Sequence, residues 1–472
     1  MKITFIQPRG RGIYSVCPEP PLGLAYLASS ILKYKNDSQI EIIDGYILDQ
    51  KEYLKKISDV DADVAGITVT MSLLNEALRI PRLVMEGRSK RDDNYKIDTK
   101  FIIGGPGVSN IPSSKLYESG YSIVCYGEGE NTIVDLMKAF EGKQSLDEVR
   151  GISYLSNRGE VKTPPRERIE NLDDLPVPAR DLLDMEKYIG TWKEKMGIAL
   201  THIVSSRGCQ FSCRFCDKAV YGKKTKFHSP ARLIEEMREL YGKYKAEMVF
   251  FEEDLFTLNR GRVLEFCRAM EEELPRRRWG AYSRVDTVDL DMLSGMKRAG
   301  CTDLVFGVES GSQRILDFLG KGITVDGIRR AFGWAKQVGI DAGMFLIVGV
   351  PGETREDIDL TKRLIVDLEP NMINLSFLTP IPGTEIYNMT KHLIKGDIDY
   401  YDFDDLFGGV YKKEAFGVDP KASYHDIMNF FLETFRGRVD PRLSLYDGTV
   451  FHDQNSKLIE QDAGPRARKA SG

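Results

Sequence analysis

Three cysteines, Cys209, Cys213 and Cys216, lie within one stretch of eight residues. Three thiolates on one short loop can bind three irons of a four-iron four-sulfur cluster and leave the fourth iron open to a further ligand. A zinc site completed by His202 or His228 is an alternative, although structural zinc sites prefer closed pairs of ligands at separations of two to four residues. Inert buried cysteines are less favoured, because three so close together seldom serve packing alone.

The composition narrows the class of protein. The chain has 472 residues, a net charge of -5 and seven cysteines. An odd, uneven set of cysteines favours metal ligation in a reducing compartment over a disulfide framework, so we expect the cytoplasm. Lys and Arg are scattered, which argues against a nucleic-acid partner. We find no apolar run long enough for a transmembrane segment and no secretory signal, because the first residues lead into a strand pattern.

The elements that must position the cysteines form an α/β pattern in two large parts. Residues 1–145 alternate short β-branched runs with amphipathic stretches, which predicts a Rossmann-like, doubly wound parallel sheet with helices on both faces. Residues 146–195 contain a hairpin with its turn at residues 157–159 and then a connection rich in Pro and Asp. We place the domain boundary in this segment.

The alternation restarts in residues 196–390 with roughly six strand–helix units. This predicts a partial (β/α)6 barrel of the TIM type, with function at the carboxyl ends of its strands. The cysteines follow its first strand. Residues 391–460 form a small, mostly helical C-terminal capping region, and residues 461–472 are expected to be a disordered tail.

The cysteine spacing, with aromatic Phe215 before the last cysteine, resembles that of the radical S-adenosylmethionine (radical SAM) superfamily. The resemblance covers the whole barrel, because a family motif follows each strand in the expected order. It implies that these residues contact S-adenosylmethionine: the amino group at Glu252, Glu253 and Asp254, the carboxylate at Ser283 and Arg284, the ribose at Glu309 and Ser310, and the adenine at Gly349. Taken singly, each motif also has a structural reading as a loop, an ion pair or a turn.

The mechanism that this resemblance implies is reductive cleavage of S-adenosylmethionine at the open iron. The resulting adenosyl radical would take hydrogen from an unactivated carbon, in a site shielded from water and oxygen. A flavodoxin-like or ferredoxin-like partner would supply the electrons.

The first domain resembles the cobalamin-binding domain that is fused to many radical SAM enzymes. In this reading the corrinoid is lined by residues at the ends of the strands: Pro8, Thr68, Thr70, Gly104, Gly105, Tyr126, Gly127 and Glu128. Glycine would let the backbone approach the ring. The Asp-x-His-x-x-Gly motif of other cobalamin proteins is absent and no histidine precedes His202, so this domain supplies no histidine ligand to cobalt. A domain that has kept the fold without the corrinoid is the alternative.

A corrinoid beside a radical barrel suggests a C-methyltransferase that uses methylcobalamin to methylate a carbon or phosphorus centre of a small-molecule or natural-product substrate. One alternative is a cobalamin-dependent cyclase or ring-rearranging enzyme acting on a tetrapyrrole or lipid. Another is a non-catalytic corrinoid or redox sensor. The aromatic residues at 400–407 and in the helix-like segment 424–436 could close over a substrate, but packing is favoured because large aromatics mostly serve cores.

Overall fold

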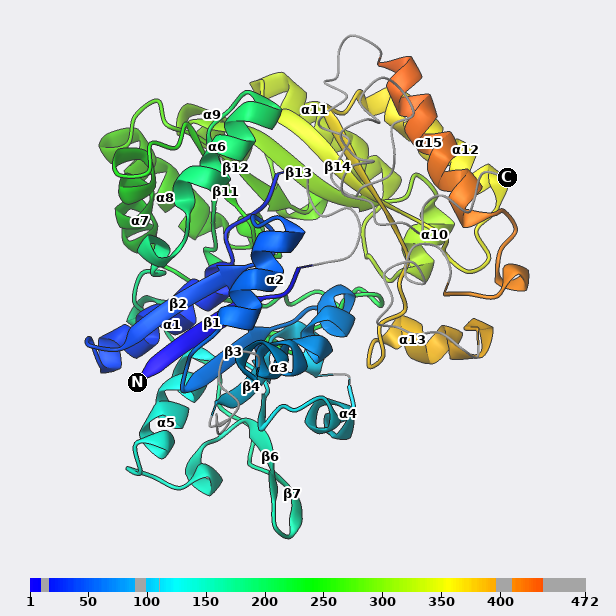
Figure 1. The fold of residues 1–472 in the computed structure, drawn as a ribbon. Coiled ribbons are helices and arrows are strands. Elements are labelled where there is room, and N and C mark those ends of the chain that lie inside the picture. The colour runs from blue at the N-terminus through cyan, green and yellow to red at the C-terminus, as the bar shows by residue number, and fades with distance from the viewer. Residues whose placement is uncertain (10–16, 90–98, 110, 396–409, 436–472) are drawn as a thin grey trace.

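The computed structural model describes residues 1–9, 17–89, 99–109, 111–395 and 410–435. The predicted aromatic stretch at 400–407 and the predicted tail at 461–472 lie outside these ranges. Figure 1 shows two sheets flanked by helices, an N-terminal sheet in blue and cyan and a curled sheet in green and yellow. Within the described residues, no helix combines the length and the apolar character needed to cross a bilayer.

The first sheet has seven strands in the order β2-β1-β3-β4-β5-β6-β7. The first five strands along the chain are parallel, and β6 and β7 add an antiparallel hairpin at one edge. The hairpin, expected between the domains, therefore extends the sheet beyond residue 145. The strands are β1 Lys2–Gln7, β2 Gln39–Asp44, β3 Val64–Thr68, β4 Lys100–Gly104, β5 Ile123–Cys125, β6 Ile152–Ser156 and β7 Gly159–Lys162.

Helices cover both faces of this sheet, as the alternating pattern predicts. The first and fifth helices pack on one face around Phe5 and Ile102, and the second and third pack on the other around Ile67 and Ile103. The strands are apolar on both sides because both sides are buried. The helices are α1 Leu22–Tyr34, α2 Gln50–Asp59, α3 Leu74–Ser89, α4 Ser113–Glu118 and α5 Glu130–Phe140.

The second sheet is the predicted partial barrel, with six parallel strands in the order β15-β14-β13-β12-β11-β8. The strands are β8 Leu200–Ile203, β11 Met248–Phe251, β12 Arg278–Ser283, β13 Cys301–Glu309, β14 Asp341–Val348 and β15 Met372–Phe377. The helices between them are α7 Pro230–Gly242, α8 Arg260–Glu273, α9 Leu290–Arg298, α10 Gln313–Phe318, α11 Val325–Val338 and α12 Arg355–Leu368. Local signals set their ends. Ser229 caps α7 ahead of Pro230, and Gly339 ends α11 with a positive φ of 77°.

Alternation along the barrel strands separates an outer core from an inner one. Val249 and Phe251 face the helices, whereas Met248 and Phe250 face the barrel interior. The inner cluster also contains Cys17 from the N-terminal domain and Trp192 from α6 Met185–Met196. The Trp192 indole donates a hydrogen bond to the carbonyl of Pro18, at 3.2 Å. The segment that begins at Cys17 is therefore inserted between the two domains, and Cys17 itself is buried.

The C-terminal helix α15 Pro420–Thr434 packs against the outside of the barrel, beside α12 (Figure 1). Phe431 and Phe435 are buried in the outer core, and Phe430 packs against it. The packing interpretation of these aromatics is confirmed. A short helix, α13 Glu385–Thr390, precedes this region.

Candidate active site

The cysteine loop follows β8 and the two-residue strand β9 Ser206–Arg207. β9 pairs antiparallel with β10 Lys226–Phe227, which comes after the loop. Gly208 makes the turn with φ +87°, and a Cβ there would lie 2.8 Å from the carbonyl oxygen of Lys224. Only glycine fits this position. The rest of the loop is fixed by backbone hydrogen bonds, including Arg214 N–H to the Leu319 carbonyl at 2.9 Å.

The three thiols are half-buried on this loop. Burial raises the pKa of Cys209, and it raises that of Cys216 to about 11, with Asp254 adding to both shifts. The guanidinium of Arg284 lies over the Phe211 ring at 3.7 Å and donates to Cys213 Sγ at 3.6 Å. Iron binding would displace the thiol protons, since the thiolate is the ligand.

The thiol arrangement decides between the two metals considered. A single tetrahedral zinc requires sulfurs about 3.8 Å apart. Among the described residues, no group of three ligand atoms within 4.8 Å of one another includes these cysteines. Of the two histidines proposed to complete a zinc site, His228 contacts Asp173 at 3.0 Å, and His202 lies inside the barrel with its Nε2 3.8 Å from Glu19. The loop therefore fits a cluster whose sulfurs bind separate irons, not a zinc ion.

The three carboxylates after β11 lie in three different environments. Glu252 follows the inward-facing Phe250 and lies with Glu19 and His202. Glu253 points outward and accepts hydrogen bonds from the backbone N–H and the hydroxyl of Ser205. Asp254 interacts electrostatically with Cys209, Cys216 and Lys218. Asp254 is thus the carboxylate of this cluster that faces the cysteine loop, while the predicted cofactor contacts of all three stay predictions.

The predicted residues at the carboxyl ends of β12 and β13 are buried and hydrogen bonded. Ser283 shares a hydrogen bond of 2.6 Å with Thr257, and Arg284 binds both oxygens of Asp286 at 2.9 Å. Glu309 accepts from Lys321 Nζ at 2.5 Å. Its φ of +69° is unusual for a side chain larger than glycine, and such strain clusters at functional sites.

The remaining predicted barrel residues have mainly structural contacts. The Ser310 hydroxyl lies 3.3 Å from that of Thr361, and Phe215 packs against the apolar cluster that contains Leu319. Gly349, with φ +76°, donates its N–H to Glu353 at 2.9 Å. Sequence reasoning missed Lys321. Glu353 was not named as a site residue, although it belongs to the segment 351–354 that sequence reasoning matched to the family's adenine motif after Gly349.

Pro8, Thr68, Gly104 and Gly105 lie at the carboxyl ends of β1, β3 and β4. Pro8 is buried, the other three are half-buried, and Thr70 is exposed nearby. A Cβ on Gly105 would lie 2.8 Å from the Val69 carbonyl oxygen, so packing within the domain already requires this glycine. These residues therefore lie together at the carboxyl ends of neighbouring strands, where open α/β sheets bind ligands.

Gly127 and Tyr126 follow β5. A Cβ on Gly127 would meet nothing within 4 Å, whereas the Tyr126 hydroxyl contacts that of Ser153 at 3.2 Å. Glu128 is buried and faces the other domain. It accepts from Arg207 Nη1 at 3.1 Å and from the Ile169 N–H at 2.8 Å. Its carboxylate is therefore already bound, and a corrinoid contact for Glu128 stays a prediction.

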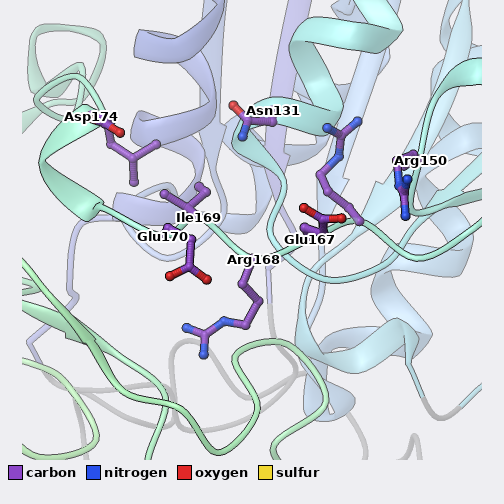
Figure 2. Close-up of a pocket in the computed structure, with 9 residues that line it drawn as sticks. Asn131, Arg150, Glu167, Arg168, Ile169, Glu170 and Asp174 are labelled. Atoms are coloured by element: carbon purple, nitrogen blue, oxygen red, sulfur yellow. The ribbon is translucent and has the colours of Figure 1, made fainter.

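A pocket of about 500 Å³ lies along the connection between the domains. Figure 2 shows Asp174 at one end and Arg150 at the other, with Arg168 between them. Arg168 donates to the carbonyl of Arg207 at 3.3 Å. None of the residues predicted from the sequence to bind a cofactor lines this pocket, so it is not the predicted site.

The comparisons with known proteins bring these features together. Residues 203–365 match the Radical SAM superfamily. The chain is 35% identical over 372 residues to an uncharacterized methyltransferase of Pyrococcus horikoshii, covering 78% of each chain. This chain belongs to the cobalamin-dependent radical SAM family. Membership of this superfamily supports a [4Fe-4S] cluster and S-adenosylmethionine as cofactors, and cobalamin is bound in two solved structures that share the fold.

Two further similarities bear on this radical SAM enzyme. It is 25% identical over 419 residues to the anaerobic magnesium-protoporphyrin IX monomethyl ester cyclase of Cereibacter sphaeroides, covering 85% of this chain and 66% of the relative. Its fold matches that of the radical SAM methyltransferase TsrM from Kitasatospora setae, solved with cobalamin and a [4Fe-4S] cluster bound. That match has a TM-score of 0.70 at 16% identity and covers 96% of this chain and 93% of that one. It confirms the predicted fold across both domains.

Arg284 supplies positive charge beside the cysteine loop of this radical SAM enzyme. Positive charge and hydrogen bonds to sulfur stabilise the reduced state of an iron–sulfur cluster. We expect Arg284→Gln to lower the reduction potential by on the order of 60 mV, which is tenfold in a one-electron equilibrium. A redox titration followed by electron paramagnetic resonance measures this. Arg260→Gln, which changes an exposed arginine, is the control, and equal potentials in both variants would contradict the expectation.

Glu353 supports the backbone of Gly349 and is 2% exposed. Burial raises its pKa from 4.5 to about 7. The folded state therefore binds the Glu353 proton more tightly than the unfolded state does. The resulting contribution to the free energy of unfolding is fully present below about pH 4.5 and is lost as the pH rises through about 7. The linked change is about 3 kcal/mol. Because glutamine has no proton to lose in this range, we expect the free energy of unfolding to fall less between pH 5 and 8 in Glu353→Gln than in the wild type. Urea unfolding across that range, with exposed Glu356→Gln as control, tests it.

Proposed function

We propose that this radical SAM enzyme transfers a methyl group to an unactivated carbon, or to a phosphorus centre, of a small-molecule or natural-product substrate. The observation that carries the proposal is the 35% identity to a protein named as a methyltransferase over 78% of both chains. An alignment of 372 residues is longer than either domain of this chain, so it extends into the domain expected to hold the corrinoid.

The chain's own residues account for how the site would be organised. Cys209, Cys213 and Cys216 would hold three irons, and the cluster and cobalamin would supply radical formation and the transferable methyl group. Asp254 and Arg284 place a negative and a positive group beside the cysteine loop, which matches the amino and carboxylate groups of a zwitterionic cofactor.

The domain arrangement supports water exclusion around such a site. The N-terminal domain contacts the barrel through the buried Arg207 ion pairs and through the segment at Cys17. A reactive radical needs this shielding from solvent. We also propose a flavodoxin-like or ferredoxin-like electron donor and a cytoplasmic location. The odd number and uneven spacing of the seven cysteines support a reducing compartment.

A cobalamin-dependent cyclase is the second candidate. The similarity to the cyclase from Cereibacter sphaeroides over 85% of this chain favours it. The two candidates differ in what happens to the methyl group of S-adenosylmethionine: a methyltransferase moves it to the substrate, and a cyclase leaves it in place.

The test uses full-length protein reconstituted anaerobically with iron, sulfide, hydroxocobalamin and S-adenosylmethionine that carries a deuterated methyl group. Small-molecule extract supplies candidate substrates, and mass spectrometry follows the products. Deoxyadenosine, S-adenosylhomocysteine and a product bearing the labelled methyl are expected. Deoxyadenosine without S-adenosylhomocysteine would favour the cyclase. Neither product from cluster-loaded protein would leave the non-catalytic corrinoid or redox sensor as the remaining interpretation.

A further inference from the structure

Glu19, His202 and Glu252 meet inside the barrel, although they come from distant parts of the chain. His202 lies on β8 with its side chain inward, and it is the register partner of Phe250 on β11. Glu252 comes two residues after Phe250 and faces the same way. Glu19 arrives from the inserted N-terminal segment. One ligand atom from each residue lies within 4.8 Å of the others.

His202 lacks the hydrogen bonds expected of a buried imidazole. Its side chain is 2% exposed, and its Nδ1 has no hydrogen-bond partner among the described residues. Its Nε2 lies 3.8 Å from Glu19 Oε1, too far for a hydrogen bond. The ring is otherwise surrounded by Trp192 and Phe250. Burial lowers the pKa of His202, which keeps the imidazole neutral and its lone pair available.

Glu19 and Glu252 lie too close together for both to be charged unless a shared proton or a cation lies between them. Burial, the charge of Glu19 and a hydrogen bond to Glu19 raise the pKa of Glu252 well above its usual range. The guanidinium of Arg180 is nearby, but it binds Glu236 at 2.6 Å and the carbonyl of His202 at 3.1 Å. A cation between the three side chains would neutralise the pair without a shared proton.

We infer that Glu19, His202 and Glu252 form a binding site for one divalent transition-metal ion, separate from the cysteine loop. One imidazole and two carboxylates suit Zn²⁺, Fe²⁺ or Mn²⁺. Ligand atoms at 2.0–2.2 Å from the ion would require these groups to close by about 0.5 Å. The Glu19 side chain is 27% exposed, so a coordination position on that side is open to a further oxygen ligand. This inference does not depend on the proposed methyl transfer.

The experiment titrates Mn²⁺ into the cluster-loaded, full-length protein, with the cluster oxidised so that it gives no paramagnetic signal. Electron paramagnetic resonance counts the bound ion, and electron spin echo modulation detects an imidazole nitrogen on it. We expect one bound Mn²⁺ per chain with a histidine signal. Affinity should fall at least tenfold in Glu252→Gln and in Glu19→Gln, and the nitrogen signal should vanish in His202→Gln.

Glu235→Gln, which alters an exposed carboxylate on α7, is the matched control and should bind as wild type does. Cluster absorbance and iron content verify folding of every variant, and Glu19→Gln keeps the test decisive if the buried His202 variant does not fold. Wild type that binds no more Mn²⁺ than Glu252→Gln would overturn the inference, because a proton shared by the two carboxylates would then suffice. Competition by Zn²⁺ should displace the bound Mn²⁺, since zinc binds such sites more tightly.

Discussion

Cys213→Ala is expected to abolish cluster binding and all formation of deoxyadenosine. Two thiolates cannot hold three irons, and in this structure Cys213 is the sulfur that accepts the hydrogen bond from Arg284. Iron and sulfide content, visible absorbance and product analysis after anaerobic reconstitution measure the loss. Because the loop backbone is held by Gly208 and by Arg214, the apoprotein should remain folded.

Cys267→Ala is the matched control for this experiment. Cys267 is buried in the outer core of the barrel, far in sequence from the loop, and has no predicted ligand role. Its replacement costs some packing energy but should leave iron content at the wild-type level. A Cys213→Ala protein that retained a full cluster and produced deoxyadenosine would refute the assignment of the loop.

Arg207→Met is expected to lower the free energy of unfolding by about 3 to 5 kcal/mol. Arg207 is 5% exposed and binds Glu128 and Glu130 from the other domain, the latter at 2.5 Å. Its loss leaves the buried carboxylate of Glu130 without this counter-charge and leaves Glu128 only the longer contact with Arg168, at 3.8 Å. Weakening the pairing of buried charges in this way costs far more than the loss of an exposed pair. Denaturant unfolding followed by circular dichroism provides the measurement.

The matched variants separate charge from packing. Combining Arg207→Met with Glu128→Gln and Glu130→Gln removes the uncompensated charges and should recover part of the loss. Arg238→Met breaks an exposed pair with Glu273 and should cost about 1 kcal/mol or less. If Arg207→Met and Arg238→Met lowered the free energy of unfolding by the same small amount, the Arg207 ion pairs would not be important for holding the domains together.

Sequence reasoning located the cysteine loop and all six barrel strands, because each signal is local. Three thiols within eight residues and short apolar runs at regular intervals need no knowledge of distant contacts. The packing of Phe431 followed from its size and apolar character. The extension of the first sheet by the hairpin was not predicted, since an edge pairing such as Val124 with Ser153 depends on the assembled sheet.

The environments of Glu252, Glu253 and Glu128 depend on the folded structure, and the sequence predicts them only in part. Alternation from Phe250 inward and Phe251 outward could have separated Glu252 from Glu253. Glu128 could not have been assigned in this way, because its partner Arg207 lies 79 residues away on the other domain. Long-range ion pairs of this kind have no periodic signal in the chain.

The insertion of the Cys17 segment into the barrel means that the two domains are interlocked and not merely in contact. Separating them would withdraw Pro18 from Trp192 and expose an apolar barrel interior that includes Leu200 and Met248. The exposure would cost hydrophobic free energy in addition to the lost ion pairs. The enzyme should therefore unfold as one cooperative unit, and neither domain should be expected to fold correctly when produced alone. During turnover, we expect ligands to enter and leave by routes that leave the Cys17 segment packed against the barrel.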